Sequence, residues 1–208
     1  TDQQSSGRCW LFTGLNVLRA KMIDKYNLGS FEFSQNYNSF YDLLEKSNLF
    51  LQAIIDTREQ AIDSREVEWL LKNPLSDGGQ FTGVSNLIMK YGVVPAEVMP
   101  ENYQSNNTSQ ISYLLSLKLR EYGLQLRAQK DRRAPVALKT EMLKEIYQML
   151  VRAYGVPPTE FEWTLRDKSG KVVSTKSYTP QSFYKEYFGE LDLENDFVMV
   201  MNDPSREY

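Results

Sequence analysis

Cys9 is the residue whose surroundings point most clearly to covalent chemistry. It is the only cysteine of the 208 residues, and it lies between the small residues Ser6 and Gly7 and an apolar stretch. This pattern predicts a cysteine in the first turn of a helix, where free N–H groups and the helix dipole stabilise a thiolate. Gln3, six residues earlier, carries an amide suited to donate to an oxyanion. Together with the Cys9 N–H, it suggests nucleophilic attack on a carbonyl group, with each donor contributing about 3–4 kcal/mol.

Cys9 also has a purely structural explanation, because a lone cysteine beside Trp10 fits an inert position buried in a helix. A second feature of the sequence, the glycine pair Gly78 and Gly79, is open to two interpretations as well. The pair fits an ordinary surface turn, although glycine also permits the close backbone approach that strand-like pairing with a peptide requires. At this point the sequence leaves both interpretations open for Cys9 and for the two glycines.

The composition excludes several classes of protein. Charged residues make up 25% and the net charge is −3, which does not fit a nucleic-acid-binding domain. One basic cluster is better explained as a solvated turn: Arg127, Lys130, Arg132 and Arg133. A single cysteine excludes an internal disulfide and fits a reducing compartment, so a cytoplasmic location is expected. No apolar run approaches the roughly 18 residues of a membrane span, and no pattern indicates a metal or a cofactor.

Helical periodicity dominates the first three quarters of the chain. The first helix is expected to be capped by Ser5 and Ser6 and stopped at Gly29. Residues 101–110 are polar and predict a loop, and residues 130–135 predict a basic turn. Further helices are expected over residues 34–50, 67–71, 81–91, 111–129 and 139–154.

Strand patterns come only near the end of the sequence. Alternation over residues 161–165, a turn at 168–170 and apolar residues at 172–173 predict a β-hairpin. Thr179 and Pro180 begin a short helix, and residues 197–201 are expected to form a buried strand. Because helices and strands are segregated along the chain, the fold class is predicted to be α+β.

Several segments, spread over nearly the whole chain, match the pattern of one known family: Gln3, 6–10, 31–35, 73–74, 77–80, 90–95 and 202–204. Together they resemble the papain-type cysteine peptidases, and more closely the branch of bleomycin hydrolase and bacterial aminopeptidase C. Ser6 replaces the first cysteine of the papain signature and Arg8 replaces a small residue. Loss of that cysteine removes a disulfide partner, which suits a cytosolic branch.

The resemblance implies a papain-like fold and a set of site residues. Residues 1–100 would form the nucleophile-bearing helical half, 101–160 a helical insertion, and 161–208 the beginning of the β-rich half of an incomplete chain. Cys9 would be the nucleophile and Gln3 the oxyanion donor. Gly78 and Gly79 would bind the substrate. The reaction would use no cofactor or metal.

The resemblance also implies an activity: a thiol aminopeptidase that releases N-terminal residues from peptides through a Cys9 acyl-enzyme and assembles as a homohexamer. Papain-type enzymes place His and Asn about 130–150 residues after the cysteine, yet this chain contains no histidine. We therefore expect both residues, and a C-terminal arm that restricts cleavage to the substrate N-terminus, in polypeptide beyond residue 208. The chain alone should then have little or no activity.

The alternative is a non-catalytic peptide-binding module in which Cys9 is structural. The rate of Cys9 alkylation as a function of pH in the complete protein distinguishes the two, because an activated thiol reacts well below pH 8 and a buried one hardly reacts.

Overall fold

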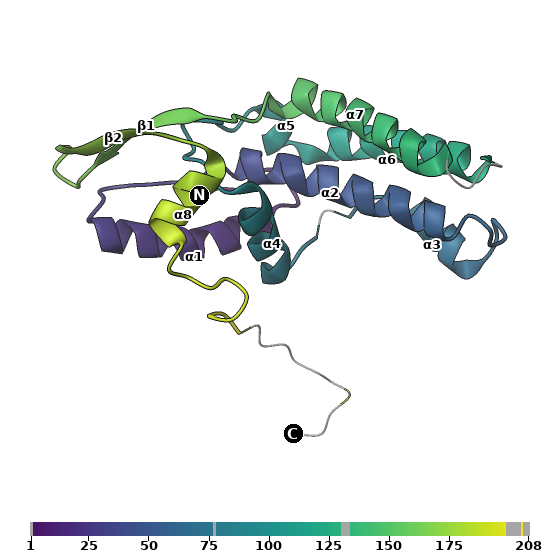
Figure 1. Ribbon diagram of the computed structural model, residues 1–208, viewed down its shortest axis with the longest axis horizontal. Coiled ribbons are helices and arrows are strands. Elements are labelled where there is room, and N and C mark those ends of the chain that lie inside the picture. The colour runs from purple at the N-terminus through teal and green to yellow at the C-terminus, as the bar shows by residue number, and fades with distance from the viewer. Residues whose placement is uncertain (1, 77, 130–133, 199–204, 206–208) are drawn as a thin grey trace.

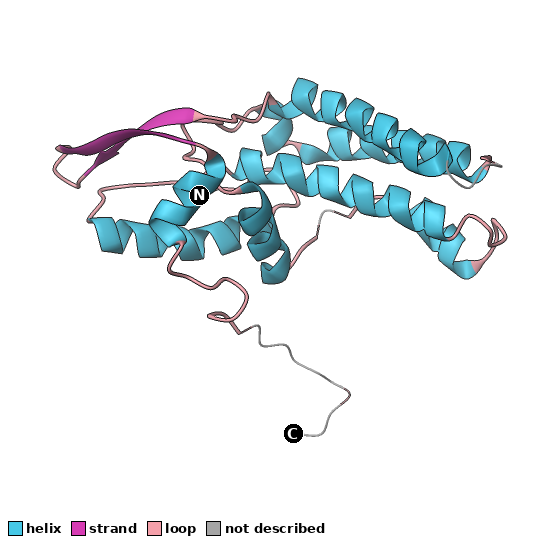
Figure 2. Ribbon diagram, in the orientation of Figure 1, coloured by secondary structure: helices cyan, strands magenta, loops and turns pink. Residues whose placement is uncertain are grey.

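The structure is a computed structural model and describes residues 2–76, 78–129, 134–198 and 205. Helices come first and a single hairpin follows, which confirms the α+β prediction (Figures 1 and 2). The elements are α1 (Cys9–Tyr26), α2 (Gln35–Asp56), α3 (Arg65–Lys72), α4 (Phe81–Tyr91), α5 (Tyr103–Asn106), α6 (Thr108–Arg127), α7 (Ala134–Tyr154), β1 (Phe161–Arg166), β2 (Val172–Tyr178) and α8 (Pro180–Phe188).

The long helices α2, α6 and α7 pack together along the long axis of the molecule (Figure 1). Helix α2 is capped by Ser34, whose hydroxyl accepts a hydrogen bond from the N–H of Tyr37 at 3.0 Å. Its apolar positions recur every three or four residues and form one core with the facing sides of α6 and α7. Fully buried members of this core include Phe40, Leu51, Leu115, Leu119, Ile146 and Leu150. Helices from residues 101–160 thus share a core with α2, and a domain boundary near residue 100 stays a prediction.

A second core fixes the helix that carries Cys9. It joins α1 to α4, α8 and the hairpin, which lies beside α1 in Figure 1. Strands β1 and β2 are antiparallel, with an irregularity between Leu165 and Arg166. Trp163 on β1 packs edge-on against Phe183 of α8, with ring centroids 5.2 Å apart. The face of α1 that enters this core consists of Leu11, Leu15, Leu18 and Met22, as its spacing predicts.

Both ends of α1 differ from the prediction. Arg8 is the N-cap residue and no side chain caps the helix, because Ser6 is engaged elsewhere. At the other end, Asn27 rather than Gly29 takes the left-handed conformation, with φ 50°, that stops the helix. A short polar side chain makes asparagine the residue after glycine that most readily adopts this conformation.

Two expected irregular segments also differ from the structure. Residues 101–110 contain α5 and the start of α6 instead of a loop, because Asn102 and Ser105 form a reciprocal capping box. Helix α7 begins at Ala134, earlier than expected, because Pro135 is tolerated in a first helical turn. Most of the expected basic turn, residues 130–133, lies outside the described residues.

The expected strand at residues 197–201 is wrong over the part that the structure describes. Phe197 and Val198 lie outside any strand, and Val198 is 86% exposed. Residues 199–201 lie outside the described part. The hairpin, the turn before β2 and the helix that begins at Pro180 are confirmed.

Candidate active site

Cys9 is the first residue of α1 and is exposed. The next turn is regular, since the N–H groups of Leu11 and Phe12 donate to the Arg8 carbonyl at 2.9 and 3.0 Å. Leu11 and Phe12 are buried and anchor this end of the helix in the protein. The thiol therefore lies at the positive end of an 18-residue helix, and it is not the inert buried cysteine of the structural alternative.

Gln3 lies in a closed loop immediately before α1. Its side-chain Nε2 donates to the Ser6 carbonyl at 2.6 Å, and the Ser6 hydroxyl donates back to the Gln3 carbonyl at 2.6 Å. This reciprocal pair folds the segment back on itself. The catalytic roles of Gln3 and Cys9 stay predictions.

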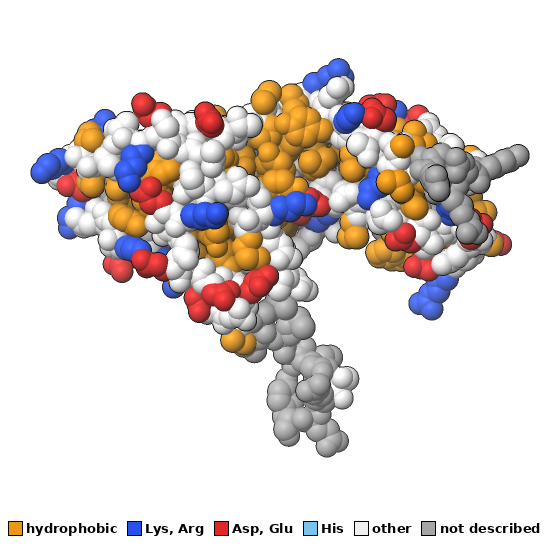
Figure 3. Space-filling model, in the orientation of Figure 1, with side chains coloured by type: hydrophobic (Ala, Val, Ile, Leu, Met, Phe, Trp, Pro, Cys, Tyr) orange, Lys and Arg blue, Asp and Glu red, His pale blue; other side chains and the backbone are white. Residues whose placement is uncertain are grey.

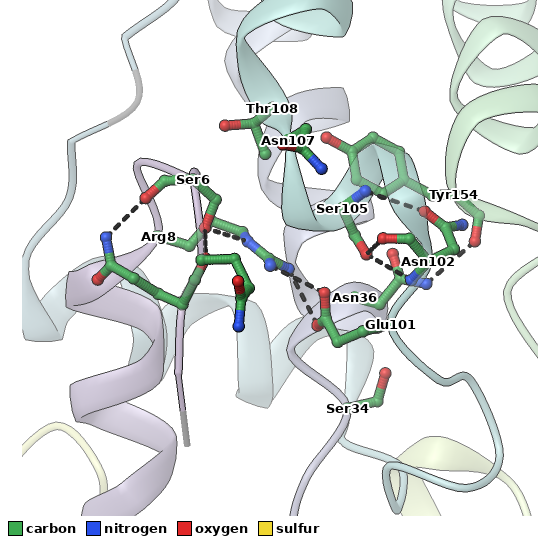
Figure 4. A network of polar contacts seen from close by, with 12 residues as sticks. Ser6, Arg8, Ser34, Asn36, Glu101, Asn102, Ser105, Asn107, Thr108 and Tyr154 are labelled. Atoms are coloured by element: carbon green, nitrogen blue, oxygen red, sulfur yellow. Dashed lines mark hydrogen bonds and ion pairs between the residues drawn. The ribbon is translucent and has the colours of Figure 1, made fainter.

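Arg8, which immediately precedes Cys9, is the charged residue that the sequence analysis left without a role. Its side chain is only 6% exposed. The two terminal nitrogens donate to the two carboxylate oxygens of Glu101 at 3.0 and 2.8 Å, and Nε donates to the Ser6 hydroxyl at 3.1 Å. Figure 4 shows this chain of contacts from Glu101 through Arg8 to Ser6. The one signal for it in the sequence is a bulky charge where the papain signature has a small residue.

The start of α6 holds the same loop from a second direction. The N–H of Gly7 donates to the Thr108 hydroxyl at 3.4 Å, and the N–H of Thr108 donates to the Ser5 carbonyl at 3.3 Å. Ser5 and Asn107 form an isolated parallel bridge. Residues 5–8, which lead into Cys9, are therefore fixed by residues 101–108, about a hundred positions along the chain.

Gly79 packs directly against the residue that follows Cys9. A Cβ placed on Gly79 would lie 2.4–2.6 Å from three atoms of the Trp10 indole. Trp10 is half-buried and packs at the edge of the α1 core. This close approach explains a glycine at position 79 better than an ordinary turn does.

Gly78 also lies at this side of the site, in an open position. Apart from its chain neighbours, no described residue has an atom within 4 Å of where the Gly78 Cβ would stand, and the Gly78 carbonyl accepts a hydrogen bond from Lys46 at 2.9 Å. The Lys46 ammonium also lies 5.2 Å from the centre of the Trp10 ring. Substrate binding by Gly78 and Gly79 stays a prediction, and the neighbouring Asp77 lies outside the described residues.

We expect Gly79→Ala to destabilise the protein by about 1–3 kcal/mol, because the new methyl group overlaps the Trp10 ring. Gly78→Ala is the matched control, since its methyl group enters open space, and it should change stability by less than about 0.5 kcal/mol. Urea unfolding of the two variants and of the wild type measures both changes in stability. Equal effects of the two substitutions would contradict the packing of Gly79 on Trp10.

A cavity of about 550 Å³ opens next to the residues that flank Cys9. Gly7, Arg8 and Trp10 form one part of its wall. Helix α6 supplies hydroxyl groups from one face, at positions three and four apart: Ser109, Ser112 and Ser116. Cys9 itself is not among the lining residues, but its neighbours Arg8 and Trp10 are, and the wall combines apolar side chains with a set of hydrogen-bonding groups, as in many ligand pockets.

Tyr154 also lines this cavity and carries a buried polar atom. The residue is 2% exposed, and its hydroxyl has no hydrogen-bond partner among the described residues. In Figure 4 the hydroxyl points away from α7 towards Asn107 and Thr108. Burial raises the pKa of Tyr154 to about 12.

This shift predicts a loss of stability at alkaline pH. The folded protein keeps Tyr154 protonated while the unfolded chain ionises near pH 10, so the contribution is complete below pH 10 and is lost as the pH rises towards about 12. Two pH units correspond to at most about 2.7 kcal/mol. Urea unfolding of Tyr154→Phe should show a smaller loss between pH 9 and 12 than the wild type, and similar stability at pH 8. If Tyr154→Phe lost as much stability between pH 9 and 12 as the wild type, the raised pKa of Tyr154 would not be a cause of the alkaline loss.

Arg127 is the one residue of the basic cluster within the described part of the chain, and its side chain is engaged inside the fold. Arg127 donates to the carbonyls of Thr57 and Gln60, at 3.0 and 2.5 Å, and so ties α6 to the segment after α2. The other three residues of the cluster lie outside the described part. On the face in Figure 3, basic and acidic side chains are interspersed without a continuous basic patch. Within the described ranges, no helix is long and apolar enough to span a bilayer.

Comparison with known proteins agrees with this arrangement. The sequence model of the Peptidase C1-like family matches residues 1–208. The chain is 42% identical to aminopeptidase C of Listeria innocua, over all of this chain and 47% of that protein. It is 37% identical to human bleomycin hydrolase, again over all of this chain and 47% of that protein. The chain thus spans about half the length of the curated relatives it matches.

A solved structure shows the same fold. The crystal structure of PepW from Lactobacillus rhamnosis HN001 matches with a TM-score of 0.89 and 42% sequence identity, over 94% of this chain and 44% of that one. This similarity confirms the predicted papain-like fold. The match of the family model over residues 1–208 and the similarity in sequence and structure together show that this chain belongs to the Peptidase C1-like family.

Proposed function

We propose that this chain is the nucleophile-bearing part of a thiol aminopeptidase, which releases single residues from peptide N-termini through an acyl-enzyme at Cys9. The observation that carries the proposal is the exposed thiol at the N-terminus of α1, preceded by the closed loop that contains Gln3. Relatives named aminopeptidase C and bleomycin hydrolase support a peptidase of this kind.

The proposed reaction uses the groups that converge before α1. The Cys9 thiolate attacks the carbonyl of the first peptide bond, and the carbonyl oxygen becomes an oxyanion. The Cys9 N–H and the second hydrogen of the Gln3 amide, whose first hydrogen is donated to Ser6, stabilise this charge. The amine of the shortened peptide then leaves with a proton, and water hydrolyses the thioester.

The general base must come from outside these 208 residues, because the chain contains no histidine. We propose that polypeptide beyond this chain supplies a histidine and an asparagine and forms the other wall of the cleft. The exposed face of α1 supports this: it continues from Cys9 through Thr13, Val17 and Ala20, with no charged side chain at these positions. A solvated helix face normally carries charge, so this face is suited to be covered. This chain alone should be inactive.

The substrate is proposed to lie between the two glycines and the cavity. Gly78 and Gly79 leave room for an extended peptide to approach the backbone. The cavity beside Gly7, Arg8 and Trp10 has room for a substrate side chain, with hydroxyl groups from α6 as hydrogen-bonding partners. A cytoplasmic location and a homohexameric assembly belong to the same proposal; the single cysteine supports the first, and the family resemblance alone supports the second.

The test is hydrolysis of aminoacyl-coumarin substrates by the full-length protein, that is, this chain together with the polypeptide proposed to carry the histidine. We expect cleavage when the substrate amine is free, little cleavage when it is acetylated, and loss of activity after treatment with iodoacetamide. The 208-residue chain measured in parallel should show no turnover. Peptide binding without any turnover by the full-length protein would refute the peptidase proposal and favour a binding module.

A further inference from the structure

The buried ion pair between Arg8 and Glu101 connects the helical segment after residue 100 to the loop before Cys9. We propose that this pair positions the oxyanion donor Gln3 and acts on it through Ser6. Arg8, Glu101 and Ser6 are positioning residues in this proposal, because none of them needs to touch the substrate. The inference rests on the proposed function of Cys9 and Gln3.

The contacts form an unbroken series from the ion pair to the amide. Both oxygens of Glu101 accept from Arg8 at 3.0 and 2.8 Å, which fixes the plane of the guanidinium group. Its Nε donates to the Ser6 hydroxyl at 3.1 Å. That hydroxyl donates to the Gln3 carbonyl, and the Ser6 carbonyl accepts from the Gln3 amide, both at 2.6 Å. The position of Ser6 therefore sets both the backbone and the side chain of Gln3.

The other end of the series is firmly held. Asn102, next to Glu101, belongs to the α5 capping box, and its amide donates to the Ala153 carbonyl at 3.0 Å. On the other side, Asn36 donates to the Pro100 carbonyl at 2.8 Å and to the Tyr154 carbonyl at 3.0 Å. Figure 4 shows the bonds between Asn102 and Ser105 and between Asn36 and the Tyr154 carbonyl. Helices α2 and α7 thereby hold the backbone on either side of Glu101.

Stability alone does not explain an ion pair between Arg8 and Glu101. Two apolar residues of similar volume often stabilise a protein as well as a buried ion pair. A flat guanidinium group with fixed donors, in contrast, transmits a defined geometry. Catalysis needs such definition, since a displacement of about 1 Å at a reacting group costs on the order of 100-fold in rate.

The experiment is a set of substitutions in the full-length protein, assayed with an aminoacyl-coumarin substrate. Ser6→Ala removes the link and leaves the ion pair, and the double substitution Arg8→Met with Glu101→Leu removes the pair without leaving a buried charge. We expect each to lower kcat by about 10- to 100-fold with KM nearly unchanged. Glu68→Ala, which breaks the exposed pair with Lys72, is the control and should leave kcat unchanged.

The same substitutions in a Gln3→Ala background separate positioning from mere structural damage. Gln3→Ala alone should lower kcat by about 100- to 1,000-fold. If Ser6 and the ion pair act through Gln3, adding either change should lower kcat by less than about threefold further, because the donor is already absent. A full additional loss, or wild-type kcat in folded Ser6→Ala and double variants, overturns the inference. An inactive wild type would instead refute the proposed function.

Discussion

Replacing Cys9 with alanine in the full-length protein is expected to lower kcat by about 10⁴- to 10⁶-fold, the loss typical of removing a catalytic nucleophile. The physical reason is that no other thiol in residues 1–208 can form the acyl-enzyme. Stability should change little, because the side chain is exposed. Hydrolysis of an aminoacyl-coumarin, together with urea unfolding, measures both effects.

Thr140→Ala is the matched control for this substitution. Thr140 is exposed on α7, away from the candidate site, and its hydroxyl donates to the Val136 carbonyl at 3.3 Å. It should keep activity within a few-fold of the wild type. Activity that survives in Cys9→Ala would show that the reaction does not pass through this thiol.

Glu101→Ala is expected to cause the largest loss of stability, about 2–4 kcal/mol, because it leaves the Arg8 guanidinium buried without its counter-charge. The Glu101 side chain is 28% exposed, so water can reach the vacated site and keep the loss at the lower end of the range for buried pairs. Urea unfolding of the full-length protein at pH 7 measures the change.

Two further variants identify the origin of this loss. Removing both charges, with Arg8→Met and Glu101→Leu, should restore most of the stability, because no charge then remains buried without a partner. Glu68→Ala, at an exposed pair between neighbouring turns of α3, should cost less than about 0.5 kcal/mol. If the double variant were as unstable as Glu101→Ala, lost packing rather than an unpaired charge would be the cause.

Local sequence patterns were sufficient for most of the fold. Helix α4 has the bounds that its apolar spacing and the following Gly92 predict, and the hairpin and α8 follow their turn and capping signals. These elements are correctly predicted because a residue and its neighbours three or four positions away determine which face is buried. The short helix α5 was not predicted, because it has only four residues and its polar capping box of Asn102 and Ser105 resembles a loop.

Only part of the candidate site could be predicted from the sequence. Cys9, Gln3 and the two glycines are recognised by their residue types and spacing. The contacts that hold this segment could not be predicted, because Arg8 and Glu101 are 93 positions apart and Gly7 and Thr108 are 101 apart. Such contacts arise when α2, α6 and the loop before α1 pack together, which no local pattern encodes.

The most direct test of Cys9 as the acyl-forming residue is to label the full-length protein with a phenylalanyl chloromethyl ketone. Its free amine mimics a peptide N-terminus, and a thiolate displaces its chloride. Trypsin then releases residues 9–19, which contain Cys9 and no other thiol. We predict that this peptide gains one inhibitor mass in proportion to the activity lost. Complete inactivation with the label on another peptide would contradict the assignment of Cys9 as the nucleophile.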